Sequence, residues 1–321
     1  MILRLANEND SQKLIDFYRE TDLTTPIQMQ LQKQGSFFFQ YQMQSNDYST
    51  YILTDPTEQD KIKAMISILF RPGVIDHELQ NIGYVTDLRI SSERKVVLEW
   101  AHTLLPTLRE AKKQRNCKYV FSVVAEAQHQ AMNAFIRPRS VRRELPRYYL
   151  YRRFQVISLH GLWPWAIAPL STISTVPATE NDRLELAKYI SHKNSERIPN
   201  YHPTPEDVLK NLERWQQLKI EDFILAKNHQ GKIIGCVALW NSQKYEQFIP
   251  TKYDSKSLTL KEMLHFYSYF STARRLSDIG TPLNFYYLSY LLADNSDIFY
   301  SLCYKSHFSV PKNFFLIYPH F

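Results

Sequence analysis

The spacing of apolar residues predicts a helix over residues 204–218. Thr204 is placed to cap this helix, Pro205 suits its first turn, and Asp207 follows the cap by three residues, as in a capping box. The apolar side chains that recur at three- and four-residue intervals, as one helix face requires, are Val208, Leu209, Leu212, Trp215 and Leu218.

Two hairpins are predicted by pairs of apolar runs separated by polar turns. One joins residues 222–227 and 232–240, and the other joins residues 49–54 and 61–70 across a turn at Asp55-Pro56. After the earlier hairpin we expect a strand at 82–90, a helix over 93–115 capped by Ser92, and a strand at 118–125. A short helix near 128–135 and a strand pair within 148–160 complete this half.

The two hairpins belong to an internal repeat. Ala6-Asn7-Glu8-Asn9-Asp10 matches Ala178-Thr179-Glu180-Asn181-Asp182 at an offset of 172, and Lys61-Ile62 matches Lys232-Ile233 at an offset of 171. A register that holds over some sixty residues indicates a tandem duplication with its boundary near residues 171–176. We therefore predict one domain at residues 1–170 and a second at residues 171–321.

The second half has fewer predicted elements than the first. Its last ones are a strand at 283–293, a helix at 297–306 and a strand at 313–319, with no counterpart to the part of the first half beyond Ala125. An apolar strand at that place leaves a sheet edge open unless another element covers it. Hairpins followed by strands joined through helices predict an α+β protein, in which two mixed, largely antiparallel sheets are flanked by helices.

Composition narrows the chemistry. Only 7 of 321 residues are glycine, about 2% against about 7% in average proteins, so a glycine-rich phosphate loop has little to draw on. The most apolar stretch, residues 161–170, is too short to span a bilayer and is interrupted by prolines. The cysteines Cys117, Cys236 and Cys303 lie far apart, and no metal-ligand spacing occurs. We expect a soluble, cytoplasmic protein with reduced thiols and no bound metal.

The repeated order of elements resembles that of the GNAT superfamily of acyl-CoA-dependent N-acetyltransferases. The stretches that carry the resemblance are ILRLANENDSQKLIDFYRE, VTDLRISSERK and FSVVAEAQHQAMNAF, similar to the family's first strand and helix, fourth strand, and fifth strand with the following helix. The resemblance implies a tandem GNAT protein, an arrangement that recurs in bacteria, with a complete first unit and a shortened second one. It also implies acetyl-CoA as co-substrate and a small-molecule or peptide amine as acceptor.

By the same resemblance, Leu88, Arg89 and Ile90 would present backbone groups to the pantetheine arm and the thioester. The next segment stands at the family's pyrophosphate loop, but it offers Arg94, Lys95 and Val96 where the family has glycine. Glu93 opposes an anion at the same place, and the position of the family's proton-donating tyrosine aligns with Phe135. These departures leave a non-catalytic, GNAT-like interaction module as the alternative function.

Asp87 is the carboxylate nearest the implied thioester site. It could accept a proton from the acceptor amine, directly or through water. The alternative is a strand-end residue that pairs with Arg89 or with a backbone N–H group. Tyr84, Glu78 and His77 are weaker candidates for the same catalytic role.

Positive charge is concentrated in residues 137–153, which hold seven arginines and one acid, Glu144. The formal net charge of the whole chain is +7. This segment could bind the 3′-phosphate of CoA, an acidic substrate or nucleic acid. We favour a linker whose arginines pair with acids of the other half, because no nucleic-acid-binding motif accompanies it. The aromatic segments 37–41 and 264–270 could line an apolar tunnel, and we favour packing in the core or between domains for both.

Overall fold

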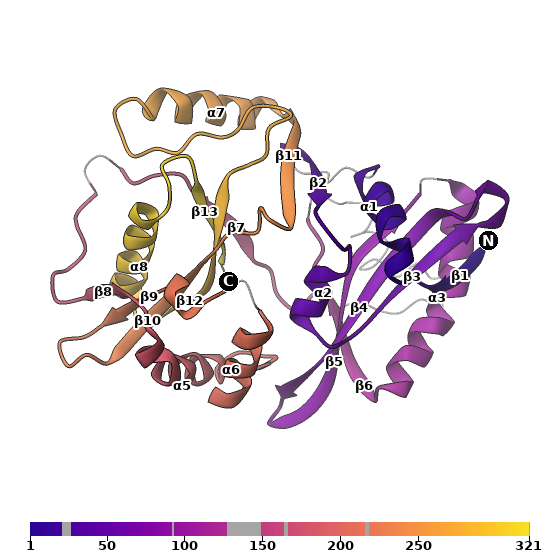
Figure 1. Cartoon of the computed structure of the whole chain (residues 1–321), viewed down its shortest axis with the longest axis horizontal. Helices are drawn as coiled ribbons and strands as arrows, with labels where there is room; N and C mark the ends of the chain where they lie inside the picture. The colour runs from indigo at the N-terminus through magenta and orange to yellow at the C-terminus, as the bar shows by residue number, and fades with distance from the viewer. Residues whose placement is uncertain (21–26, 92, 127–148, 164–165, 216–217, 321) are drawn as a thin grey trace. The chain divides into compact units, whose positions relative to one another are not determined.

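The computed structural model describes residues 1–20, 27–91, 93–126, 149–163, 166–215 and 218–320. The chain forms two units (Figure 1): the first comprises Met1–Thr25 and Met29–Arg153, and the second comprises Pro26–Gln28 and Phe154–Phe321. The sequence suggested a division near residue 170, whereas the two units divide after Arg153. The reason is that residues 155–159 pair with the last strand of the second unit.

The first unit is built on a five-stranded sheet. Its order is β1 (Ile2–Leu5), β3 (Asp47–Asp55), β4 (Lys61–Ile75), β5 (Glu78–Ile90) and β6 (Cys117–Ser122). All neighbours are antiparallel except β5 and β6, which are parallel. A parallel neighbour requires a crossover, and α3 (Arg94–Gln114) supplies it.

Helices cover both faces of this sheet, since its strands alternate buried side chains on either side. Leu53 and Ile66 pack with Val96, Trp100 and Leu104 of α3. Figure 1 shows α1 (Ser11–Arg19) on the opposite face from α3. The segment before and within α2 (Phe39–Gln44) is buried, as predicted for residues 37–41: Phe37, Phe38 and Tyr41 are at most 2% exposed.

The second unit repeats this plan and adds one strand. Its sheet runs β8 (Ser174–Pro177), β9 (Phe223–Lys227), β10 (Ile233–Trp240), β12 (Phe285–Ala293), β13 (Phe315–His320) and β7 (Gln155–Leu159). The pair β12 and β13 is parallel, like β5 and β6. The remaining strand, β7, runs antiparallel along β13 and covers the edge that the sequence left open.

Helices α5 (Arg183–Asn194) and α6 (Pro205–Arg214) pack on one face of the second sheet, and α8 (Ser296–Ser309) packs on the other. The predicted capping box of α6 is present, since the Thr204 hydroxyl accepts the Asp207 N–H. The remaining described helices and strands are β2 (Ile27–Lys33), β11 (Glu246–Tyr253) and α7 (Ser255–Tyr267). The predicted α+β class is confirmed.

Two expectations from the sequence need correction, and a third concerns residues that the structure does not describe. The strand pair expected within residues 148–160 is a single strand, β7, because its partner is the distant β13. Core packing of residues 264–270 is wrong, since Phe266 and Phe270 are 61% and 67% exposed. Ser92 and the helix expected near 128–135 lie outside the described residues. None of the described helices combines the length and apolar character needed to cross a bilayer.

Candidate functional site

A β-bulge in β5 marks the candidate site. Met65 pairs with Arg89 and Ser67 pairs with Thr86, so that Asp87 and Leu88 together face Ile66 alone. Asp87 has φ +53°, a left-handed conformation that L-residues other than Asn and Asp rarely adopt. Bulges of this kind re-aim side chains and often adjoin functional sites.

Beyond the bulge, β4 is the one described strand that pairs with β5. The parallel pairing of β5 with β6 ends at Val85 and Ser122, while its pairing with β4 continues to Ile90. Leu88, Arg89 and Ile90 therefore lie on a strand edge whose backbone groups on the β6 side have no strand partner among the described residues. Such an edge can pair with an extended, amide-containing ligand.

The side chain of Asp87 is held from three elements at once. The Tyr18 hydroxyl of α1 donates to Oδ1 at 2.7 Å, and the Tyr41 hydroxyl of α2 donates to Oδ2. The ammonium of Lys33, at the end of β2, lies 3.9 Å from Oδ2. Sequence reasoning missed these partners, which lie 46 to 69 positions away from Asp87.

These contacts fix the protonation states of the cluster. Burial alone would raise the pKa of Asp87, but the Lys33 charge, the two tyrosine hydroxyls and Arg89 outweigh it and hold this pKa below its usual value. Burial, and then the Asp87 charge, raise the pKa values of Tyr18 and Tyr41. At neutral pH the cluster therefore holds an ionised carboxylate that is a weak base, between two protonated tyrosines.

The helix α3 begins just after the bulge strand and carries the implied pyrophosphate residues. Its N-cap, Glu93, makes no side-chain capping bond, so its first N–H groups are not satisfied in that way. The Glu93 carboxylate is instead 2.8 Å from the Lys63 ammonium, which offsets its charge. Lys95 is exposed, whereas the Val96 side chain is fully buried in the core, so Val96 can offer a ligand only its backbone.

The weaker catalytic candidates lie apart from Asp87. Tyr84 stacks on Phe121 in the paired part of β5, and burial raises its pKa, so it stays protonated at neutral pH. His77 and Glu78 lie at the turn between β4 and β5, roughly 30 Å from Asp87 at the rise of a strand. The structure does not bring these two residues to the candidate site.

The second unit has a bulge at the matching place with different chemistry. Cys236 pairs with Leu292 and Ala238 pairs with Ser289, so that Tyr290 and Leu291 face Val237. The Asn211 amide donates to the Tyr290 hydroxyl at 2.6 Å, and burial raises the pKa of Tyr290 to about 12. The Tyr290 ring lies beside those of Trp215 and Phe223. An aromatic cluster continues from Trp215 to Trp240, which stacks on Tyr287.

The helix that comes after this second bulge is closed to anions. The Asn295 side chain caps α8 by accepting the Ile298 N–H at 3.0 Å. Asp297 lies in its first turn, and Asp294 precedes the cap. Asp294 is paired with the Lys193 ammonium at 2.8 Å, so Asp297 and the existing cap are the features that disfavour a phosphate group at this helix N-terminus.

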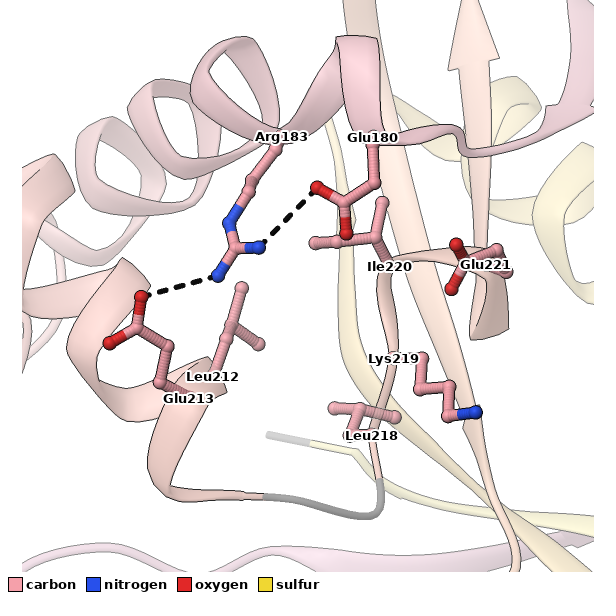
Figure 2. Close-up of a pocket in the computed structure, with 8 residues that line it drawn as sticks. All are labelled: Glu180, Arg183, Leu212, Glu213, Leu218, Lys219, Ile220 and Glu221. Atoms are coloured by element: carbon pink, nitrogen blue, oxygen red, sulfur yellow. Dashed lines mark hydrogen bonds and ion pairs between the residues drawn. The ribbon is translucent and has the colours of Figure 1, made fainter.

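A separate hollow of the second unit, about 340 Å³ in volume, lies between the start of α5, the end of α6 and the segment before β9. Figure 2 shows that the Arg183 guanidinium in its wall points at two carboxylates, those of Glu180 and Glu213, each at 3.3 Å. Lys219 and Glu221 add one charge of each sign. With its arginine already paired and its charges mixed, this hollow offers no focused anion or cation site.

Several candidates cannot be placed. Phe135 and the arginines of residues 137–147 lie outside the described residues, as does the side chain of Arg94. The three cysteines are free and buried. In the described part of the chain, no three His, Cys, Asp or Glu side chains gather closely enough to hold a metal ion.

Comparison with known proteins bears on the fold. No protein-family model and no curated protein matches the chain. A fungal structure described as a GCN5-related glucosamine N-acetyltransferase region of a multi-domain β-N-acetylglucosaminidase matches with a TM-score of 0.53 at 12% identity, over 96% of this chain. A conserved Enterococcus faecalis V583 protein, described as a probable N-acyltransferase, matches with a TM-score of 0.50 at 6% identity, over 99% of this chain.

The chain spans 34% of the fungal structure and 65% of the Enterococcus structure. At these identities the likeness concerns the fold. The chain has a GNAT-like fold.

Proposed function

We propose that the first unit is an acyl-CoA-dependent N-acyltransferase, which moves an acetyl or related acyl group from CoA to an amine. The observation that carries this proposal is the combination of the Asp87 bulge, the part of β5 that extends past its pairing with β6 at Val85, and the start of α3 just beyond it. A thioester arm with two amide groups fits a strand edge, and a pyrophosphate fits a helix N-terminus.

In this proposal the backbone of Leu88, Arg89 and Ile90 pairs with the pantetheine arm of acetyl-CoA. The N–H groups of the first turn of α3, with the side chains of Arg94 and Lys95, take the pyrophosphate in place of a glycine-rich loop. The Glu93–Lys63 pair supports this role, because it removes the charge that most directly opposes an anion there.

The acceptor is a small-molecule or peptide amine that approaches from the face of α1 and α2. The acceptor ammonium loses one proton to solvent, and its nitrogen then bonds to the thioester carbonyl carbon. The carbon–sulfur bond breaks, the sulfur takes a proton from Tyr84 and leaves as the CoA thiol, and the second proton lost by the nitrogen restores the Tyr84 hydroxyl. Asp87 is ionised and attracts the ammonium form of the acceptor, and we assign it an electrostatic and positioning role. Tyr84 stays protonated and is the candidate proton donor on β5.

We also propose that the two units arose by tandem duplication and that the second does not bind acyl-CoA. In each unit a single 3-10 turn, Glu8–Asp10 after β1 or Glu180–Asp182 after β8, leads into the next helix and is closed by a capping box. The two sheets share strand order, strand direction and the position of the bulge. The capped and acidic start of α8 supports the second part of the proposal.

Titration calorimetry of the full chain with acetyl-CoA tests the proposal. We expect one site, and Lys95→Ala should weaken binding severalfold because the pyrophosphate loses a cation. Lys256→Ala is a matched control, since Lys256 is an exposed lysine in the first turn of α7, as Lys95 is in α3. No binding at millimolar acetyl-CoA, or equal effects of the two variants, would contradict the assignment.

Binding without turnover would favour the alternative of a non-catalytic module. That outcome is read from release of the CoA thiol in the presence of a panel of small amines and peptides. The hydrogen bonds that Asp87 accepts from Tyr18 and Tyr41 are the observation that supports this alternative, because they occupy both carboxylate oxygens.

A further inference from the structure

The second unit carries an insertion between two strands that are adjacent along the chain in the first unit. There β4 leads into β5 through the turn at Asp76 and His77, whereas residues 241–284 separate β10 from β12, the matching strands of the second unit. This insertion holds β11 and α7. Figure 1 shows α7 at one end of the second unit and α5 and α6 at the other. The insertion is extra to the repeated fold, so its surface needs an explanation of its own.

The helix α7 turns its apolar side outwards. Large side chains spaced by three and four residues, as on one helix face, are 44% to 67% exposed, and they are Met263, Phe266, Tyr267 and Phe270 just beyond the helix. The half-buried residues on the opposite side of the helix are Ser257, Lys261 and Leu264. A surface helix ordinarily buries its apolar stripe and exposes its polar side. In α7 this arrangement is reversed.

The exposed apolar surface is wider than one stripe. Leu258 and Leu260 are 47% and 46% exposed, and at 3.6 residues per turn they mark the edges of a sector of about 200°. Trp163 extends the surface: it is 68% exposed and follows Leu162, whose N–H donates to the Thr272 hydroxyl at 3.4 Å. A groove in a folded partner contacts one stripe of a helix, whereas the interface of a bilayer accommodates a broader apolar sector.

Positive charge accompanies this apolar surface. Residues 252–278 hold five Lys or Arg and three Asp or Glu. Asp254 is engaged as the cap of α7, since it accepts the Ser257 N–H at 2.7 Å. Asp278 is paired with Lys261 at 2.7 Å. The exposed cations of this stretch are Lys252, Lys256 and Arg275. Cations around an aromatic surface complement anionic lipid headgroups.

We propose that α7, together with Phe270 and Trp163, binds the second unit to the anionic surface of a lipid bilayer. The helix lies in the plane of the interface and does not cross the bilayer. The rings of Phe266 and Phe270, whose centroids are 4.8 Å apart, enter the boundary between headgroups and acyl chains. Lys252 and Lys256 reach the lipid phosphates. Tyrosine and tryptophan suit this depth, because each has an apolar ring and a polar tip.

Co-sedimentation of the full chain with vesicles tests the apolar part of the proposal. We expect binding to vesicles of phosphatidylcholine and phosphatidylserine. Phe266→Gln combined with Phe270→Gln should weaken it by about a factor of ten or more, because two aromatic side chains no longer leave water. Leu184→Gln is the matched control, since Leu184 is 54% exposed on α5 at the other end of the unit. It should leave binding unchanged.

The same assay tests the role of charge. Binding should be weaker to vesicles of phosphatidylcholine alone and should fall as salt is added. Lys252→Gln combined with Lys256→Gln should weaken binding to the anionic vesicles by roughly a factor of ten at low salt. The control removes two exposed lysines of α5 and α6, as Lys188→Gln with Lys210→Gln, and should change binding little.

Thermal unfolding and light scattering on the same samples complete the test. The changed side chains are exposed, so all variants should keep the Tm of the unmodified protein. Absence of binding to the anionic vesicles, or variants that keep both their Tm and their vesicle binding, would overturn the proposal. A dimer that becomes a monomer in the Phe266→Gln, Phe270→Gln variant would also overturn it, because α7 would then be a contact between two copies of the chain.

Discussion

Asp87 and Tyr290 occupy the same position in their two sheets: each is the first residue of a two-residue bulge, with φ +53° and +51°. A left-handed backbone is costly for tyrosine, so the bulge is kept in the second unit by the sheet around it. The backbone device is thus shared, while a charged cluster surrounds one bulge residue and an aromatic cluster surrounds the other.

Asp87→Asn should lower the free energy of unfolding by roughly 3 kcal/mol, because it leaves the Lys33 ammonium buried without its carboxylate. Asparagine tolerates the left-handed conformation, so backbone strain does not confuse the result. The loss should be smaller in a Lys33→Met background, which removes the stranded charge. Urea unfolding measures all three variants, and equal losses in the two backgrounds would contradict the coupling.

Since the folded-state pKa of Asp87 is lowered, its stabilising effect should be fully present above about pH 4 and lost as pH falls through the folded-state pKa. The loss of unfolding free energy caused by Asp87→Asn should therefore be the same at pH 7 and pH 5.

Tyr290→Phe is the matched control at the second bulge, where the loss of one hydrogen bond from Asn211 should lower the free energy of unfolding by about 1 kcal/mol.

His307 should make the second unit sensitive to acid. Burial, and then the Arg274 charge, lower its pKa to about 4, so the folded state resists a proton that the unfolded chain accepts near pH 6.5. Stability should be highest above about pH 6.5 and fall by up to about 1.4 kcal/mol per pH unit towards pH 4. Urea unfolding at pH 7.5 and 5.0 should show a smaller pH dependence of stability in His307→Leu than in the unmodified protein. The exposed control His265→Leu should keep the pH dependence of the unmodified protein.

Gly235 lies where α8 packs on β10. An added Cβ would stand 2.5 Å from Cγ2 of Ile298 and 3.0 Å from Cδ1 of Leu302. Gly235→Ala should therefore cost roughly 1–3 kcal/mol by overpacking. Thermal unfolding of Gly235→Ala, of Ile298→Ala and of the double variant tests the contact. Costs that simply add would show that Ile298 is not the obstacle.

The thiols should be unreactive in the folded protein. Cys117, Cys236 and Cys303 are buried, and burial raises the pKa of Cys303 to about 12, which leaves almost no thiolate at pH 8. Burial raises the pKa values of the other two thiols as well. An aromatic disulfide reagent should label all three only after the chain unfolds. Rapid labelling of one thiol in the native protein would contradict its placement.

The sequence predicted most of the helices and strands, because the spacing of apolar residues along each segment indicates them. The offset of 171 that joins Lys61-Ile62 to Lys232-Ile233 placed β4 and β10, and the apolar pattern after Thr204 placed α6. Pairings between distant segments leave no local mark. The placement of β7 beside β13, which moves the unit boundary to Arg153, depends on a match of edges more than 150 residues apart.

The candidate site was predicted in part for the same reason. Asp87 and its neighbours were found through the resemblance of one continuous stretch. Tyr18, Lys33 and Tyr41 come from three other elements and meet Asp87 only through tertiary packing. Charge could not be read locally either, since Glu93 opposes an anion in the sequence and is offset by Lys63 in the structure.

Amide hydrogen exchange with and without acetyl-CoA tests most directly whether acyl-CoA lies along Leu88–Ile90, the part of β5 beyond its pairing with β6. We predict slower exchange at Leu88–Ile90 and in the first turn of α3, because the pantetheine amides and the pyrophosphate cover these N–H groups. Exchange at the matching residues of the second unit, Leu291–Ala293, should not change. Protection that appears only in β12, or nowhere in β5 at saturating acetyl-CoA, would contradict the account.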